Sequence, residues 1–162
     1  MGMRINTNTQ SIAAQRSLGG VKRAQHFFNR FLQSKKVEDI NMVTMAKIRD
    51  KVNSVGEMFL TGDVTDRHVI IIDDMADTAG TLVKASNILR DSGANKITVV
   101  VTHPVLSGNA YNNLSKSNID NIITTNSLPF NFEKVVGKLK QKEIKIVSLA
   151  ETLAKYIEVV NQ

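Results

Sequence analysis

Short apolar runs alternate with amphipathic stretches along the chain from Asn41 onward. The strongest run is Val69 to Ile72, four β-branched residues in a row within a strand predicted at 68–72. Weaker runs predict further strands at 42–45, 96–101, 121–125 and 144–147. Apolar runs that are continuous rather than alternating are typical of parallel strands buried on both faces. The pattern therefore favours a buried parallel sheet.

Helices are predicted around these strands, because apolar residues recur there every three or four positions. The expected ranges are 21–31, 78–91, 107–115 and 149–160. In the second range Leu82, Ala85 and Leu89 form one stripe, and Ser92-Gly93 is a typical helix stop. Strands alternating with helices indicate an α/β fold, with a mostly parallel central sheet flanked by helices. Ligands in such folds bind at the carboxyl ends of the strands.

The first sixteen residues do not fit this alternation. They begin with a polar, turn-rich stretch, and Ser11–Gln15 reads as helix or irregular structure. We therefore expect an atypical amino-terminal segment at 1–16 and one α/β domain at 17–162, since a chain of 162 residues is long enough for a single domain with its own core.

Composition narrows the function classes. The chain has no cysteine, which excludes disulfides and thiolate metal sites. No apolar run approaches the roughly 20 residues that span a bilayer, and the amino terminus lacks a signal-peptide apolar region, so we expect a cytoplasmic protein without a membrane partner. The net charge of +6 is scattered, aromatic residues make up 5% and tryptophan is absent, so nucleic-acid binding is not expected.

The residues after the strongest strand carry the candidate chemistry. Asp73 and Asp74 follow the buried run directly. At a strand end, two carboxylates can accept hydrogen bonds from two vicinal ribose hydroxyls. They can also help to hold Mg²⁺, directly or through water.

A small, hydroxyl-rich turn leads from these acids into the helix, with the sequence Asp77-Thr78-Ala79-Gly80-Thr81. The first N–H groups of a helix lack intrahelical partners, and the helix dipole favours a phosphate there. Gly80 lets the backbone approach closely, while Thr78 and Thr81 offer hydroxyl donors. One loop can thus grip both ends of a ribose 5-phosphate. The plainer alternative is a capped helix with its acids in solvent.

The pattern Asp-Asp-Met-x-Asp-Thr-x-Gly-Thr at 73–81 resembles that of the phosphoribosyl pyrophosphate synthases, also called ribose-phosphate pyrophosphokinases. Ordinary type I phosphoribosyltransferases have a related acidic pair but usually not this spacing. Further segments that resemble the family lie at 45–50, 61–64, 102–110, 124–129 and 146–157. The resemblance covers about 18–160 and is to the carboxy-terminal domain, which implies a phosphoribosyltransferase-like fold.

The resemblance also implies an activity. Family members transfer the β,γ-pyrophosphoryl group of Mg-ATP to the C1 hydroxyl of ribose 5-phosphate, giving phosphoribosyl pyrophosphate and AMP for nucleotide biosynthesis. Asp73, with Asp74 beside it, would bind the ribose hydroxyls, and residues 77–81 would hold the 5-phosphate. Mg²⁺ would enter with ATP as substrate, and we assign no metal ligand to the chain.

Lys47 resembles the family's catalytic lysine and Arg49 its companion, in a flexible catalytic loop. Two residues apart, they point to one side of an extended segment. Phosphoryl transfer needs such positive charge around the reacting oxygens, although from sequence alone two solvated surface cations would be the ordinary reading. His103 follows a buried strand and receives no role.

The chain departs from the family pattern on the ATP side. The family's amino-terminal domain, which supplies much of the ATP site, has no counterpart in these residues. Gly19 and Gly20 resemble a remnant of the pyrophosphate loop, but Ser17 stands where the family has a metal-binding aspartate. A neutral hydroxyl is a far poorer Mg²⁺ ligand than a carboxylate.

Several functions therefore stay open. The first is a synthase, active alone or as half of an active unit. The second is a non-catalytic module that binds a sugar phosphate or regulates a synthase. A phosphoribosyltransferase acting on a base is a third, but the sequence offers no base-recognition hood. Expected partners are ribose 5-phosphate or phosphoribosyl pyrophosphate, ATP, and either further copies of the chain or a full-length synthase.

Overall fold

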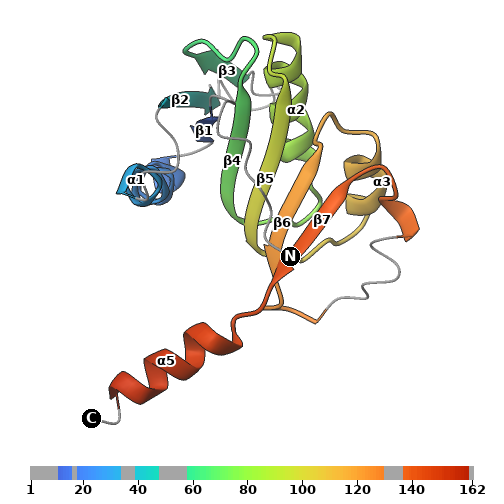
Figure 1. The fold of residues 1–162 in the computed structure, drawn as a ribbon. Coiled ribbons are helices and arrows are strands. Elements are labelled where there is room, and N and C mark those ends of the chain that lie inside the picture. Colours follow the sequence, from blue (N-terminus) through green and yellow to red (C-terminus); the bar gives the residue numbers. More distant parts are fainter. Residues whose placement is uncertain (1–10, 16–17, 34–38, 48–57, 130–136, 161–162) are drawn as a thin grey trace.

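A seven-stranded sheet forms the centre of the molecule (Figure 1). The computed structural model describes residues 11–15, 18–33, 39–47, 58–129 and 137–160. The strand order is β3-β2-β1-β4-β5-β6-β7. Neighbouring strands pair in parallel, except that β3 runs antiparallel to β2. The predicted α/β class with a mostly parallel sheet is confirmed.

The strands have the following bounds: β1 Ser11–Gln15, β2 Ile40–Lys47, β3 Met58–Thr61, β4 His68–Met75, β5 Lys96–His103, β6 Asn121–Thr125 and β7 Glu143–Val147. The helices are α1 Leu18–Gln33, α2 Gly80–Asp91, α3 Ala110–Ser115 and α5 Ala150–Val160. All five predicted strands and all four predicted helices are present, with shifted ends in most cases.

The expectation of helix or irregular structure at Ser11–Gln15 is wrong. These residues form β1, which lies between β2 and β4 and pairs in parallel with both. A short run such as Ile12-Ala13-Ala14 has little β propensity of its own, so its two neighbours decide its conformation. The antiparallel strand β3 was not predicted either.

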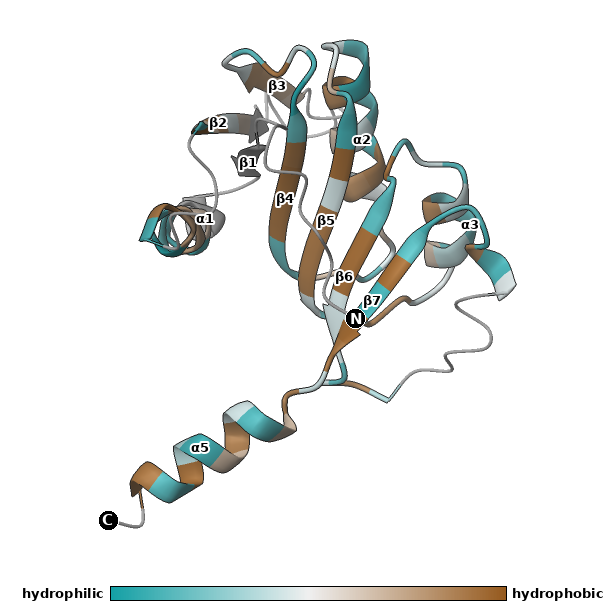
Figure 2. Ribbon diagram, in the orientation of Figure 1, coloured by the Kyte–Doolittle hydropathy of each residue, from teal (hydrophilic) through white to brown (hydrophobic). Residues whose placement is uncertain are grey.

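Two apolar layers cover the two faces of the sheet. On one face, α2 packs its predicted stripe of Leu82, Ala85 and Leu89 against β4 and β5, and all three side chains are buried. On the other face, Phe27 of α1 packs against the buried cluster of Ile70 and Ile72. Figure 2 shows the hydrophobic stretches of the central strands in brown. Strand β4 is therefore buried on both sides, as its continuous apolar run requires.

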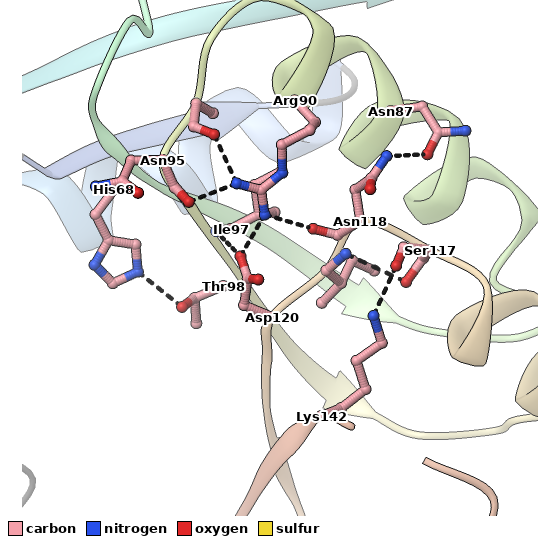
Figure 3. Close-up of polar contacts among 12 residues, drawn as sticks. His68, Asn87, Arg90, Asn95, Ile97, Thr98, Ser117, Asn118, Asp120 and Lys142 are labelled. Carbon is pink, nitrogen blue, oxygen red and sulfur yellow. Dashed lines mark hydrogen bonds and ion pairs between the residues drawn. The ribbon is translucent and has the colours of Figure 1, made fainter. Parts of the chain in front are cut away.

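A polar network ties together the edge of the sheet where β5 and β6 begin (Figure 3). Asp120 accepts hydrogen bonds from the Arg90 guanidinium and from the Ile97 N–H, each at 2.7 Å. Arg90 also donates to three backbone carbonyl groups, those of Ala94, Asn95 and Asn118. This network fixes the carboxyl end of α2. The amino end of the same helix lies at the opposite edge of the sheet.

The last helix stands apart from the sheet (Figure 1). None of the residues of α5 is buried, and Leu153, Tyr156 and Ile157 are largely exposed. Its start is fixed by the Asn126 side chain, which accepts a hydrogen bond from the Leu149 N–H at 2.9 Å. Among the described residues, no helix combines the length and apolar character needed to cross a bilayer.

Candidate functional site

A cavity of about 500 Å³ opens at the carboxyl end of β4. The lining consists of Arg23 of α1 and of the continuous segment from Asp73 to Leu82. All seven residues predicted to bind the substrate lie in this lining: Asp73, Asp74, Asp77, Thr78, Ala79, Gly80 and Thr81. Ligand sites in proteins commonly have volumes of this order, and open α/β sheets place them at this edge.

The turn into α2 leaves backbone N–H groups at the start of the helix without an intrahelical acceptor. Ala79 adopts the left-handed conformation with φ 59° and ψ 2°, and α2 begins at the next residue. The Val83 N–H donates to the Ala79 carbonyl at 3.0 Å, which is the first bond of the helical ladder. The N–H groups before Val83 therefore belong to the first turn, where the helix provides no acceptor for them. Gly80 would leave room even for a Cβ, whose nearest neighbour within 4 Å would be Thr78 Oγ1 at 3.9 Å.

The two acids at the end of β4 face a cation from another element. Arg23 reaches Asp74 at 3.4 Å and Asp73 at 3.8 Å. Asp73 is the more enclosed of the two acids, with 13% of its side chain exposed against 44% for Asp74. Hydrogen bonding with the Asp73 side chain, together with the smaller effect of the Arg23 charge, holds the pKa of Asp74 below its ordinary value. Asp74 is therefore ionised at neutral pH.

Residues 106–113, which come after β5, form hydrogen bonds to the loop between β4 and α2. We call this segment the bracket. The Leu106 N–H donates to the Ala76 carbonyl at 2.9 Å. The Ser107 hydroxyl donates to the Asp77 carboxylate. The Asn113 side chain donates to the Thr78 carbonyl at 2.8 Å. Three consecutive loop residues, 76 to 78, are thus each bonded by the bracket.

None of the described residues predicted for the ATP side lines this cavity. Lys47 is the last residue of β2 and Arg49 lies outside the described residues. Because β2, β1 and β4 are parallel, the end of β2 reaches the same edge of the sheet as Asp73, two strands away. At about 4.8 Å between strands, this is a backbone separation of roughly 10 Å. The part of the predicted flexible loop that is described, from Met45 to Lys47, is strand paired with β3.

Gly19 and Gly20 belong to the first turn of α1, which is the next element after β1 in the described residues. They therefore lie at a helix start beside the carboxyl end of a central strand, and Ser17 lies outside the described residues. His103 is the last residue of β5, and its Nδ1 lies 2.9 Å from the Ser127 hydroxyl.

Sequence reasoning missed Arg23, Ser107 and Asn113. Arg23 lies 50 residues before Asp73, and nothing in the local pattern of α1 links the two. Ser107 and Asn113 occur in a turn and a six-residue helix, where polar residues are common. Within the described residues, no group of three or more His, Asp or Glu side chains is arranged to hold a metal ion.

Comparison with known proteins identifies the family. Residues 32–161 match the family described as the phosphoribosyl synthetase-associated domain. The ribose-phosphate pyrophosphokinase of Helicobacter hepaticus is 38% identical over 90% of this chain and 43% of its own length. Ribose-phosphate pyrophosphokinase 3 of Saccharomyces cerevisiae is 40% identical over 91% of this chain and 42% of its own length. The chain thus spans less than half the length of these curated relatives.

Comparison with solved structures gives the same family and the same fold. The phosphoribosylpyrophosphate synthetase of Mycobacterium smegmatis superposes with a TM-score of 0.74 at 28% identity, over 93% of this chain and 44% of that protein. A hypoxanthine-guanine phosphoribosyl transferase of L. donovani, at 14% identity and a TM-score of 0.52, covers 90% of this chain and shares the fold alone. The phosphoribosyltransferase-like fold is therefore confirmed. The chain belongs to the phosphoribosyl synthetase-associated domain family, and its resemblance to the ribose-phosphate pyrophosphokinases is confirmed.

Proposed function

We propose that this chain is the ribose 5-phosphate-binding part of a ribose-phosphate diphosphokinase. The reaction transfers pyrophosphate from Mg-ATP to ribose 5-phosphate and yields phosphoribosyl pyrophosphate for nucleotide biosynthesis. One observation carries the proposal. A single cavity has the two acids Asp73 and Asp74 at the end of β4 and the open first turn of α2 at its other side.

The two halves of this cavity suit the two ends of the sugar phosphate. Asp73 and Asp74 accept hydrogen bonds from the ribose hydroxyls. The backbone N–H groups of the turn, with the Thr78 and Thr81 hydroxyls, bind the 5-phosphate, because the helix dipole favours negative charge there. The Asp77 carboxylate already accepts from Ser107, so this residue contributes its backbone to the phosphate.

In the transfer step, the C1 oxygen of the sugar forms a bond to the β-phosphorus of ATP. The bond from that phosphorus to the oxygen shared with the α-phosphate breaks, AMP leaves with the electron pair, and the C1 hydroxyl loses its proton. The role of the protein in such a step is positioning and charge stabilisation. We assign the stabilising charges to Lys47 and Arg49, and the start of α1 at Gly19 and Gly20 to the transferred pyrophosphate.

The donors in the cavity fit a magnesium ion that arrives with its nucleotide. Mg²⁺ prefers carboxylate, phosphate and water oxygens, and one or two protein carboxylates usually suffice in phosphate-handling sites. Asp73 and Asp74 supply hard oxygen donors of this kind. The ion supplies charge neutralisation for the polyphosphate when bound. Arg23 is a cation that pairs with both of these acids.

The second candidate is a non-catalytic module that binds the sugar phosphate or regulates a synthase. Ser17, in place of the family's metal-binding aspartate, favours it, because a neutral hydroxyl is a far poorer Mg²⁺ ligand than a carboxylate. In either case we propose a cytoplasmic protein that associates with further copies of itself or with a full-length synthase.

Two measurements separate these functions. Calorimetry with ribose 5-phosphate tests the site, and release of AMP from Mg-ATP in the presence of ribose 5-phosphate tests turnover. Asp73→Ala should abolish sugar-phosphate binding, and Lys47→Ala should abolish turnover while leaving binding in place. Asp91→Ala and Lys84→Ala, at exposed positions of α2, are the matched controls.

The outcomes are distinct. Binding with turnover supports the synthase, and binding without turnover supports the module. Absence of ribose 5-phosphate binding in the folded wild-type chain would refute both. Consumption of phosphoribosyl pyrophosphate in the presence of a free purine or pyrimidine base would instead favour a phosphoribosyltransferase.

A further inference from the structure

We infer that Asn113 is a positioning residue for phosphate binding, which it serves by fixing the peptide bond between Thr78 and Ala79. The inference rests on the proposed sugar-phosphate site and adds a residue that does not line its cavity. Asn113 acts indirectly, through its hydrogen bond to the Thr78 carbonyl at 2.8 Å.

The geometry of the peptide bond gives this contact its effect. In a trans peptide, the carbonyl of one residue and the N–H of the next lie in one plane and point in opposite directions. The chain contains no cis peptide among its described residues. With the Thr78 carbonyl bonded to Asn113 on α3, the Ala79 N–H must point away from α3. Ala79 lines the cavity, so this N–H is aimed at the position of the phosphate.

The peptide needs to be held, because its conformation is not the one that alanine prefers. Ala79 has a φ of 59°, in the left-handed region that glycine and asparagine adopt far more easily. Rotation of the Thr78–Ala79 peptide would relieve this conformation and would turn the carbonyl oxygen toward the phosphate. An oxygen in that position would repel an anion instead of binding it. The bond from Asn113 opposes such a rotation.

Asn113 is itself held in place. The next residue, Leu114, is buried in the same core cluster as Leu82 of α2, and the Asn113 N–H donates to the Asn109 carbonyl at 2.9 Å. The helix that carries Asn113 is therefore anchored to the helix that opens at the phosphate site. The bonds of Leu106 and Ser107 to residues 76 and 77 extend the same bracket along the loop. The loop is thus preorganised for its ligand, which lowers the cost of ordering it on binding.

The test uses Asn113→Leu, which keeps the approximate size of the side chain and removes its donor. Asn112→Leu is the matched control, on the same helix at an exposed position. Affinities are measured by calorimetry for ribose 5-phosphate and 2-deoxyribose 5-phosphate, and by ³¹P NMR for inorganic phosphate. Thermal unfolding of each variant is recorded alongside. Ser107→Ala, which removes the neighbouring bond of the bracket, serves as a second variant if Asn113→Leu does not fold.

We expect Asn113→Leu to weaken binding of all three ligands by a similar factor, about tenfold, as for loss of one hydrogen bond that orients a binding group. The preference for ribose 5-phosphate over its 2-deoxy analogue should stay at the wild-type ratio, because the acids of β4 are untouched. Ser107→Ala should weaken inorganic phosphate binding in the same direction, and Asn112→Leu should change nothing.

Two results would overturn the inference. One is wild-type affinity for phosphate in Asn113→Leu, and the other is loss of the ribose preference together with phosphate affinity, which would indicate general damage to the site. Failure of the proposed function appears differently. If the wild-type chain does not bind ribose 5-phosphate but binds inorganic phosphate in an Asn113-dependent way, the proposed function falls and the positioning role stands. If the wild-type chain binds neither, both fall.

Discussion

The guanidinium of Arg23 lies 3.4 Å from the carboxylate of Asp74, and this ion pair joins α1 to the carboxyl end of β4. Asp73 lies within 3.8 Å of the same guanidinium. A guanidinium within about 4 Å of a carboxyl group favours the ionised form of that group. The residues predicted to bind ribose hydroxyls are therefore stabilised by a helix from an earlier part of the chain.

Arg23→Gln should raise the pKa of Asp74 toward its ordinary value. The rise should be incomplete, because hydrogen bonding with Asp73 is the larger cause of the lowered pKa and persists in the variant. NMR titration of the Asp74 carboxyl measures this. Lys22→Gln removes the same charge from the neighbouring exposed position and should leave the titration unchanged. An unaltered Asp74 titration in Arg23→Gln would contradict the ion pair.

The same pair makes a small contribution to stability that depends on pH. Because the folded pKa of Asp74 lies below its unfolded value of about 3.9, the contribution is present above that pH and is lost as the pH falls through the folded pKa. With more than 40% of each side chain exposed, its size should be below about 1 kcal/mol. Urea unfolding of wild type and Arg23→Gln should therefore differ slightly at pH 6 and converge at pH 2.5.

Gly62→Ala should destabilise the protein by about 2–4 kcal/mol. Gly62 has a φ of +114°, and an added Cβ would come within 2.6 Å of Val43 Cγ1. Val43 is buried in the core, so it has little room to move, and both backbone strain and overpacking oppose the change. Gly137→Ala is the control, since a Cβ there would meet no atom within 4 Å. Urea unfolding should separate the two variants, and equal midpoints would refute this account of Gly62.

Much of this fold could be predicted because its strongest signals are local. The run Val69 to Ile72 is buried on both faces of the sheet, and the Leu82 stripe packs as its spacing requires. Strand β1 escaped prediction because its five residues gain their conformation from pairing with β2 and β4, which are distant in sequence. An alanine-containing segment carries no comparable signal of its own.

In the candidate site, too, local residues could be predicted from the sequence and distant ones could not. The residues from Asp73 to Thr81 are contiguous, so a sequence pattern could identify them together. Arg23 and Asn113 reach that loop through tertiary contacts across 50 and 35 positions, which no local pattern encodes. The contacts that support the loop could therefore not be predicted, because they depend on how α1 and α3 pack.

His68 should make the protein less stable as the solution is acidified. Burial, and to a lesser extent the nearby positive charge of Lys96, lower the pKa of His68. The unfolded chain, with a histidine pKa near 6.5, then binds more protons than the folded chain just below that pH, so stability is lost as the pH falls through this window. His68→Gln should flatten the loss between pH 7 and 5 in urea unfolding, whereas His26→Gln, at an exposed position of α1, should not. Parallel pH profiles for wild type and His68→Gln would refute the assignment.

Gly80 should matter for the ligand and hardly at all for the fold. An added Cβ at Gly80 would have only Thr78 Oγ1, at 3.9 Å, within 4 Å, so a side chain there stands in open space at the cavity that this residue lines. Alanine is also the better helix former, by up to about 1 kcal/mol, so the thermal midpoint of Gly80→Ala should stay constant or rise by a few degrees. Close approach of the phosphate to the backbone is what the methyl group would obstruct. Affinity for ribose 5-phosphate, measured by calorimetry, should therefore fall about tenfold in Gly80→Ala and further in Gly80→Val. Unchanged affinity in both folded variants would mean that the phosphate does not reach this turn, and the proposed orientation of the sugar phosphate in the cavity would be wrong.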